Sequence, residues 1–188
     1  EDIDNKHFES TKFINCNFKN TNFRSSIFGD CEFVNCYFIG CDFTWVKSFN
    51  LGLRDCKFDY CSIAGLELND SDSYNTVFEN SNEIADLIIR GFGDRDLRFS
   101  SCNLLCLQVE PIQKQHIDRL SFEDCIIKES SFNRIDFLNS EIRDCSLSLN
   151  TFSSCTLTKE TLIGENSAPG DEFNMIDIRT ILNSSPLD

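Results

Sequence analysis

The chain has 188 residues, with 31 acidic side chains against 17 basic ones and a formal net charge of −14. This length suffices for one domain with its own core, and the sequence contains no run of 18 apolar residues that would span a membrane. The negative charge argues against direct binding to nucleic acid or anionic lipid, because both require a basic surface, but it leaves basic protein partners open. Residue 1 is Glu and no signal segment precedes the first repeat, so we expect a processed chain or part of a longer protein.

From residue 8 to residue 78 a bulky apolar residue recurs at every fifth position, interrupted only by Ser48 and Ser73. A helix would carry such residues around all its faces, and a flat strand would alternate them between two faces. The period therefore predicts a chain that turns a corner every five residues and points the centre of each short strand toward one axis. The residue two positions earlier should also point inward. Those positions are small: Thr11, Cys16, Thr21, Ser26, Cys31, Cys36 and Cys41.

Two further blocks continue the period after Phe78. One extra residue shifts the register, and the second block runs through Ile84, Ile89, Asp94, Phe99, Leu104 and Val109. After a loop at 110–119, the third block is regular again: Phe122, Ile127, Phe132, Phe137, Ile142, Leu147, Phe152, Leu157 and Leu162.

This pattern resembles the pentapeptide-repeat family over most of the chain. The resemblance implies an all-β fold, a right-handed quadrilateral parallel β-helix with four pentads per 20-residue coil and about seven coils. We therefore expect a solenoid at 1–162, with blocks 8–78, 84–109 and 122–162, and a separate tail at 163–188. Residues 20 apart should stack. One such column would hold Phe18, Phe38, Phe58 and Phe78, and a polar corner column would hold Asn15, Asn35, Asp55 and Asn75.

The 11 cysteines fit the same scheme. Ten of them occupy the inward small position: Cys16, Cys31, Cys36, Cys41, Cys56, Cys61, Cys102, Cys125, Cys145 and Cys155. No C-x-x-C motif occurs and no histidine lies near these columns, which argues against zinc. Parallel stacked side chains fit disulfide geometry poorly, so we interpret them as buried free thiols in a reducing, cytoplasmic compartment. Cys106 alone lies outside the set and is a candidate exposed, reactive thiol.

The sequence contains no pattern that indicates a catalytic site. His7 and His116 lack a regularly spaced nucleophile and carboxylate, and no Gly-rich phosphate loop appears. A filled tube also lacks the cleft in which catalytic groups gather. We expect no enzyme activity, no metal and no cofactor.

The sequence is compatible with two kinds of binding function. The first is a generic protein-interaction module, favoured by opposite charges one coil apart: Lys12 over Glu32, Lys47 over Glu67, and Glu123 over Arg143. The second follows the family's best-known relatives, the quinolone-resistance proteins. That resemblance implies an acidic rod that mimics DNA and binds a type II topoisomerase such as DNA gyrase. One unbroken acidic face would favour the mimic, and a patchwork of charges would favour the module.

The loop at 110–119 is our predicted partner-contact site, because Pro111 cannot donate a ladder hydrogen bond and scaffold loops often carry function. Its candidate contact residues are Pro111, Ile112, Lys114, His116 and Ile117. The alternative is a passive connection that absorbs a change of register.

The tail contains a predicted short helix in "EFNMIDIRTIL", opened by Asp171 and ended before Pro186. We expect it either to cap the last coil, whose strand edges need cover, or to form a dimer contact as in some relatives. The residues concerned are Phe173, Met175, Ile176, Ile181 and Leu182.

Overall fold

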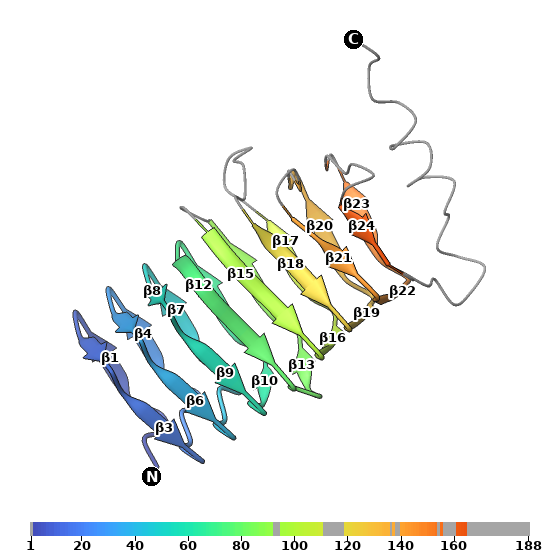
Figure 1. Ribbon diagram of the computed structural model, residues 1–188. Helices are drawn as coiled ribbons and strands as arrows, with labels where there is room; N and C mark the ends of the chain where they lie inside the picture. The colour runs from blue at the N-terminus through green and yellow to red at the C-terminus, as the bar shows by residue number, and fades with distance from the viewer. Residues whose placement is uncertain are drawn as a thin grey trace.

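The computed structural model describes residues 2–91, 95–110, 119–135, 137, 140–153, 155 and 161–164. Their architecture is a parallel β-solenoid, and the described part contains no helix. Strands of successive coils lie side by side along the rod in chain order, as the change from blue to red in Figure 1 shows. One sheet contains eight strands, one from each successive coil, and the step from its first strand to its last corresponds to about seven turns.

The described strands form four series, one for each pentad of a coil. Series 1 consists of β1 (His7–Glu9), β4 (Ile27–Gly29), β7 (Lys47–Phe49), β11 (Glu67–Asn69), β14 (Ile88–Arg90), β17 (Gln108–Glu110), β20 (Ser131–Asn133) and β23 (Thr151–Ser153). Series 2 consists of β2 (Lys12–Ile14), β5 (Glu32–Val34), β8 (Gly52–Arg54) and the first part of β12 (Asp72–Glu79), which bends into series 3.

Series 3 consists of β3 (Asn17–Lys19), β6 (Tyr37–Ile39), β9 (Lys57–Asp59), the rest of β12, β15 (Arg95–Ser100), β18 (Leu120–Glu123), β21 (Ile142–Arg143) and β24 (Leu162–Ile163). Series 4 begins with isolated bridges that join Asp2, Asn22, Asp42 and Ser62. It continues through β10 (Ile63–Ala64), β13 (Ile84–Ala85), β16 (Asn103–Leu105), β19 (Ile126–Lys128) and β22 (Ser146–Ser148).

The strand register confirms the predicted period and its two breaks. Phe38 pairs with Phe58, 20 residues later, whereas Leu68 pairs with Ile89, 21 residues later, because of the extra residue before Ile84. Phe99 pairs with Phe122, 23 residues later, because the intervening coil contains the segment 110–119. Asp94 lies outside the described residues.

Stacked rings fill the interior of the first coils. In series 3 the ring of Phe38 lies 5.0 Å from that of Phe18 and 4.5 Å from that of Phe58, nearly parallel to both. Phe38 is fully buried, whereas Phe8, Phe13 and Phe18 at the start of the rod are only partly so. Each fully buried Phe contributes roughly 1.5–3 kcal/mol, so these columns supply much of the stability.

The corners explain the polar residues between strands. In most of the described coils the residue two positions after a central residue adopts a left-handed conformation, with φ near +50° in Asn15, Asn35 and Asp55. Asn, Asp and Gly tolerate this region best. The predicted polar column is confirmed, because the Asn35 side chain donates to Asn15 at 2.7 Å and the Asn75 side chain donates to Asp55 at 2.7 Å.

The two serines that interrupt the period, Ser48 and Ser73, occupy central positions and are buried. The Ser48 hydroxyl lies 3.1 Å from the Glu67 carbonyl oxygen, to which it donates, and 3.3 Å from the Ser71 hydroxyl. The Ser73 hydroxyl has no hydrogen-bond partner among the described residues. An apolar cavity of about 20 Å³ lies beside Phe28 and Leu68, the residues that pair with Ser48 one coil before and after it. The shorter side chain thus leaves a small gap in the column.

Three expectations about the fold stay predictions: the right-handed quadrilateral cross-section, the boundary at 162 and the C-terminal helix. The residues from 165 to the C-terminus, which include the predicted helix, lie outside the described residues.

Candidate functional site

Charged side chains on the outer wall of series 1 to 3 pair with one another between coils. In series 2, Glu32 lies between two cations, 2.6 Å from Lys12 and 3.1 Å from Arg54. In series 1, Lys47 lies 3.3 Å from Glu67, which confirms that predicted stack. The predicted stack of Glu123 and Arg143 is also confirmed by the strand register, although Arg143 forms its ion pair with Glu141 of its own coil, at 3.1 Å. Ion pairs of this kind join neighbouring coils in each of the three series.

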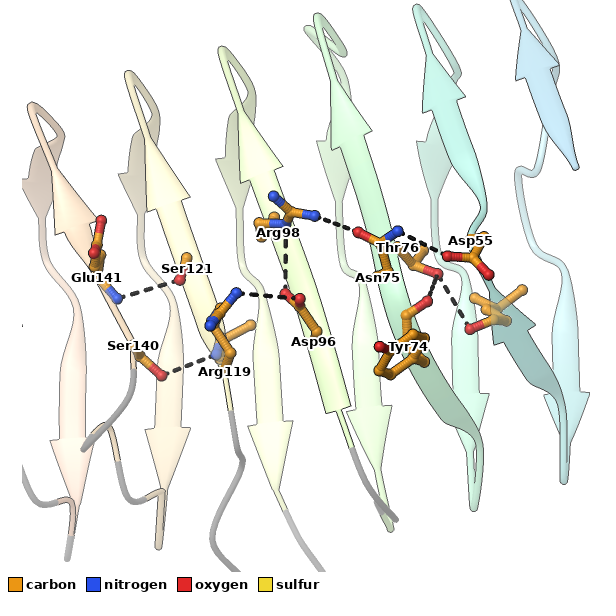
Figure 2. Close-up of polar contacts among 12 residues, drawn as sticks. Asp55, Tyr74, Asn75, Thr76, Asp96, Arg98, Arg119, Ser121, Ser140 and Glu141 are labelled. Carbon is orange, nitrogen blue, oxygen red and sulfur yellow. Dashed lines mark hydrogen bonds and ion pairs between the residues drawn. The ribbon is translucent and has the colours of Figure 1, made fainter. Parts of the chain in front are cut away.

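A hydrogen-bonded ladder follows the corner between series 2 and series 3 (Figure 2). Beyond Asn75, which binds Asp55, the guanidinium of Arg98 donates to the Asn75 side chain at 2.6 Å. Asp96 accepts from Arg119 at 3.3 Å and also lies 3.4 Å from Arg98. Arg119, at the end of the segment 110–119, is thus fixed to the wall of the preceding coil.

The cysteines are free thiols, eight of them buried, and several donate to backbone carbonyl oxygens. The Cys56 thiol donates to the carbonyl oxygens of Phe33 and Arg54, each at 3.4 Å. Burial raises the pKa of Cys56 to about 12. Cys106 occupies a corner and is partly exposed. Its pKa is raised, mainly by desolvation and to a smaller extent by the nearby carboxylates of Asp86 and Glu129. A raised pKa disfavours the thiolate, so the prediction of a reactive Cys106 is not supported.

Among the described residues, the most exposed aromatic side chains lie in a short part of the rod. All three tyrosines and the single tryptophan of the chain are exposed between residues 37 and 74. Their exposed fractions are 45% for Tyr37, 53% for Trp45, 64% for Tyr60 and 62% for Tyr74. Phe49, which the register placed outside the core, is 51% exposed beside them in series 1. Our sequence analysis did not single out this group, although its outward and corner positions in the pentad were readable.

The predicted site residues lie outside the described part of the chain. This applies to Pro111, Ile112, Lys114, His116 and Ile117 of the loop, and to Phe173, Met175, Ile176, Ile181 and Leu182 of the tail. His7 is described: it is exposed on β1 and lies 3.1 Å from Glu9. Among the described residues no three His, Cys, Asp or Glu side chains are grouped to hold a metal ion. Within those same residues we find no helix long and apolar enough to cross a membrane.

Comparisons with known proteins give one family model and several solved structures. A comparison with curated proteins gives no match. Two solved structures of QnrB1, a plasmid-mediated fluoroquinolone resistance protein, are similar at 13% and 11% identity with TM-scores of 0.48 and 0.46. Both cover 93% of this chain, and 97% and 99% of their own. HetL, a pentapeptide repeat protein involved in heterocyst differentiation regulation in a Nostoc cyanobacterium, has 8% identity and a TM-score of 0.30 over 81% of this chain and 86% of its own.

These TM-scores are too low to bear on function. The family model for pentapeptide repeats, in contrast, matches residues 16–47 directly, with eight copies. This match falls where the Phe ladder and the left-handed corners are most regular. Residues 16–47 therefore match the pentapeptide-repeat family, and the described coils that follow keep the same parallel pairing between coils.

Proposed function

We propose that this chain is a non-catalytic protein-interaction module, a rigid acidic rod that binds a protein partner through its outer wall in the cytoplasm. The observation that carries the proposal is the exposure of every tyrosine and tryptophan within residues 37–74. Tyr and Trp are the residues most enriched at the energetic centres of protein interfaces. In a solenoid whose core is built from Phe, Leu, Ile and Cys, these four side chains are not needed for the core.

The filled interior also supports a function on the wall. Stacked rings and aliphatic side chains occupy the axis of the described coils, and the cavity beside Ser48 is too small for a ligand. Groups available to a partner are therefore those on the outer wall and in the connecting segments. We propose no cofactor and no catalytic residue.

The test is a pull-down from the native host with the partner identified by mass spectrometry. The unaltered chain is compared with a variant that carries Tyr37→Ser, Trp45→Asn, Tyr60→Asn and Tyr74→Ser. The matched control removes exposed aliphatic residues instead, by Ile14→Ser, Ile126→Ser and Leu149→Asn. We expect one stoichiometric partner to be lost from the aromatic variant and kept by the control. Absence of any partner, or equal capture by both variants, would refute the proposal.

The DNA-mimic alternative predicts a different outcome of the same experiment. Capture of a type II topoisomerase such as DNA gyrase, competed by duplex DNA, would support it. In series 1 to 3 the ion pairs between coils argue against the unbroken acidic face that it requires.

The loop at 110–119 stays our second proposed contact, and the tail a proposed cap or homodimer contact. Shortening the loop to one in-register pentad should weaken partner capture while circular dichroism stays unchanged. Removing residues 171–188 should cause aggregation if they form a cap, and a clean monomer in sedimentation if they form a dimer contact.

A further inference from the structure

The outer surface is hollowed at the corner between series 3 and series 4, directly before strands β10 and β13. A depression of about 210 Å³ opens there, lined by Tyr60, Cys61, Ser62, Asn80, Asn82 and Glu83. It coincides with the one-residue insertion. Ser81 occupies the inward small position, where its hydroxyl accepts a hydrogen bond from the Cys61 amide at 3.1 Å. Asn82 and Glu83 are therefore both outside the core before Ile84 enters it.

An exposed aromatic side chain flanks each end of β10. Tyr60 forms the corner before this strand, and Trp45 lies across Gly65, the corner after it, so closely that a Cβ on Gly65 would overlap the indole ring. Both aromatic residues adopt a left-handed backbone, with φ of 53° and 59°. This conformation is common to the corners of the coil, but it is less favourable for bulky L-residues than for Asn, Asp or Gly. The two aromatic side chains thus occupy strained positions without contributing to the buried core.

The same surface carries negative charge that is not neutralised. Among the described residues no Lys or Arg forms an ion pair with Glu83, Asp42 or Asp86. The described basic side chains on the outside of series 4 are Arg24 and Lys128, two or more coils from β10 and β13. Lys128 is itself paired with Glu129 at 3.3 Å. In series 1 to 3, by contrast, ion pairs join carboxylates and cations between coils.

We propose that this surface, taken as part of the interaction function above, binds an arginine side chain of a protein partner. The guanidinium enters the depression, stacks on Tyr60 and hydrogen-bonds to the Glu83 carboxylate. A planar guanidinium suits this pair better than an ammonium group, since it stacks on aromatic faces and binds carboxylates through two parallel bonds. The small outward side chains of Ala64 and Ala85 let the partner backbone approach, and Trp45 accepts a neighbouring apolar side chain.

The test uses a random dodecamer peptide library selected against the unaltered chain. Selected peptides are then measured against Tyr60→Ala and Glu83→Gln. The controls are Ile14→Ala, which removes an exposed apolar side chain on series 2, and Glu123→Gln, an exposed glutamate on series 3. We expect enrichment of arginine, affinity losses of about tenfold or more in the two test variants, and less than about twofold in the controls. Exchange of the peptide arginine for citrulline, which is uncharged and similar in shape, should cause a loss of the same size.

Two outcomes would overturn the inference. If selected peptides bind the Tyr60→Ala and Glu83→Gln variants as well as the unaltered chain, the contact lies elsewhere and the proposed interaction function survives. If no peptide binds above background, the arginine site is refuted, and the host pull-down decides the interaction function separately. Circular dichroism of each variant must match that of the unaltered chain, and Tyr60→Asn provides a second variant with a residue suited to the left-handed corner.

Discussion

The first and second halves of the rod build the same coil from different core residues. In residues 2–78 the series 3 column is aromatic and tightly stacked, with ring centroids 4.4–5.0 Å apart from Phe18 to Phe78. Farther along, Phe99 lies 5.2 Å from Phe78 and 5.3 Å from Phe122, and the column then continues with Ile142. In series 4 the column changes from Phe23 and Phe43 to Leu104, Ile127 and Leu147. The five-residue spacing and the left-handed corners are common to both halves, so these features specify the coil, and the aromatic rings add packing energy.

Deletion of one ring from the first half should have the largest effect. Phe38→Ala should cost about 3–5 kcal/mol in the free energy of unfolding, because it leaves a cavity between Phe18 and Phe58. Phe49→Ala removes a ring that is 51% exposed and should cost less than about 1 kcal/mol. Equilibrium urea unfolding measures both. Equal losses would contradict the assignment of inward and outward positions.

The contrast between these two phenylalanines shows what the sequence could predict. Spacing alone placed Phe38 inside and Phe49 outside, because a chain that turns every five residues has few other ways to bury one side chain per pentad. The insertion before Ile84 was also readable as a shift in register. The depression between Tyr60 and Glu83 that results from this insertion could not be predicted, because it depends on which residue of the longer segment turns inward. That choice follows from the hydrogen bond between Ser81 and Cys61, a contact between coils.

Corner geometry in the first half gives the second prediction. Gly65→Ala should cost about 2 kcal/mol, because φ is +65° and the new methyl group would overlap Trp45. In the Trp45→Ala background the same change should cost only about 1 kcal/mol, the free energy needed to hold an alanine in the left-handed conformation. Gly40→Ala is the matched control, since its φ is +61° and its near neighbour is the flexible Asn20 side chain. A Gly65→Ala loss that persists without Trp45 would mean that the indole does not rest on this corner.

Buried thiols should make the first half sensitive to alkaline pH. The folded chain holds the Cys56 pKa at about 12, above the value of 9.0 expected without burial. This stabilisation is complete below pH 9 and is lost as the pH rises from 9 toward 12, because the unfolded chain then releases a proton that the folded chain retains. Cys56→Ala should reduce the slope of the unfolding free energy in this range by up to about 1.4 kcal/mol per pH unit. Thr76→Ala, the next residue of the same column, should leave the slope unchanged.

An exchange of core residues between the halves should have a smaller effect. Phe58→Leu removes a ring stacked at 4.5 Å on Phe38 and at 4.4 Å on Phe78, and should cost about 1–2 kcal/mol beyond its loss of volume. Ile127→Leu in the aliphatic half conserves volume and should cost less than about 1.5 kcal/mol. Chemical denaturation of both variants provides the comparison. Equal costs would mean that ring stacking contributes nothing special to the first half.

The smallest expected effect concerns the two serines that interrupt the columns of the first half. Ser48 is held by the Glu67 carbonyl oxygen and lies beside Ser71, so Ser48→Ala should destabilise the fold by about 1 kcal/mol. The buried hydroxyl of Ser73 has no partner among the described residues, and Ser73→Ala removes an unsatisfied polar group. It should therefore be neutral or stabilise the fold by up to about 1 kcal/mol, as measured by the urea midpoint at constant m-value. A clear loss of stability in Ser73→Ala would show that this hydroxyl is bonded in solution, for instance to a buried water molecule.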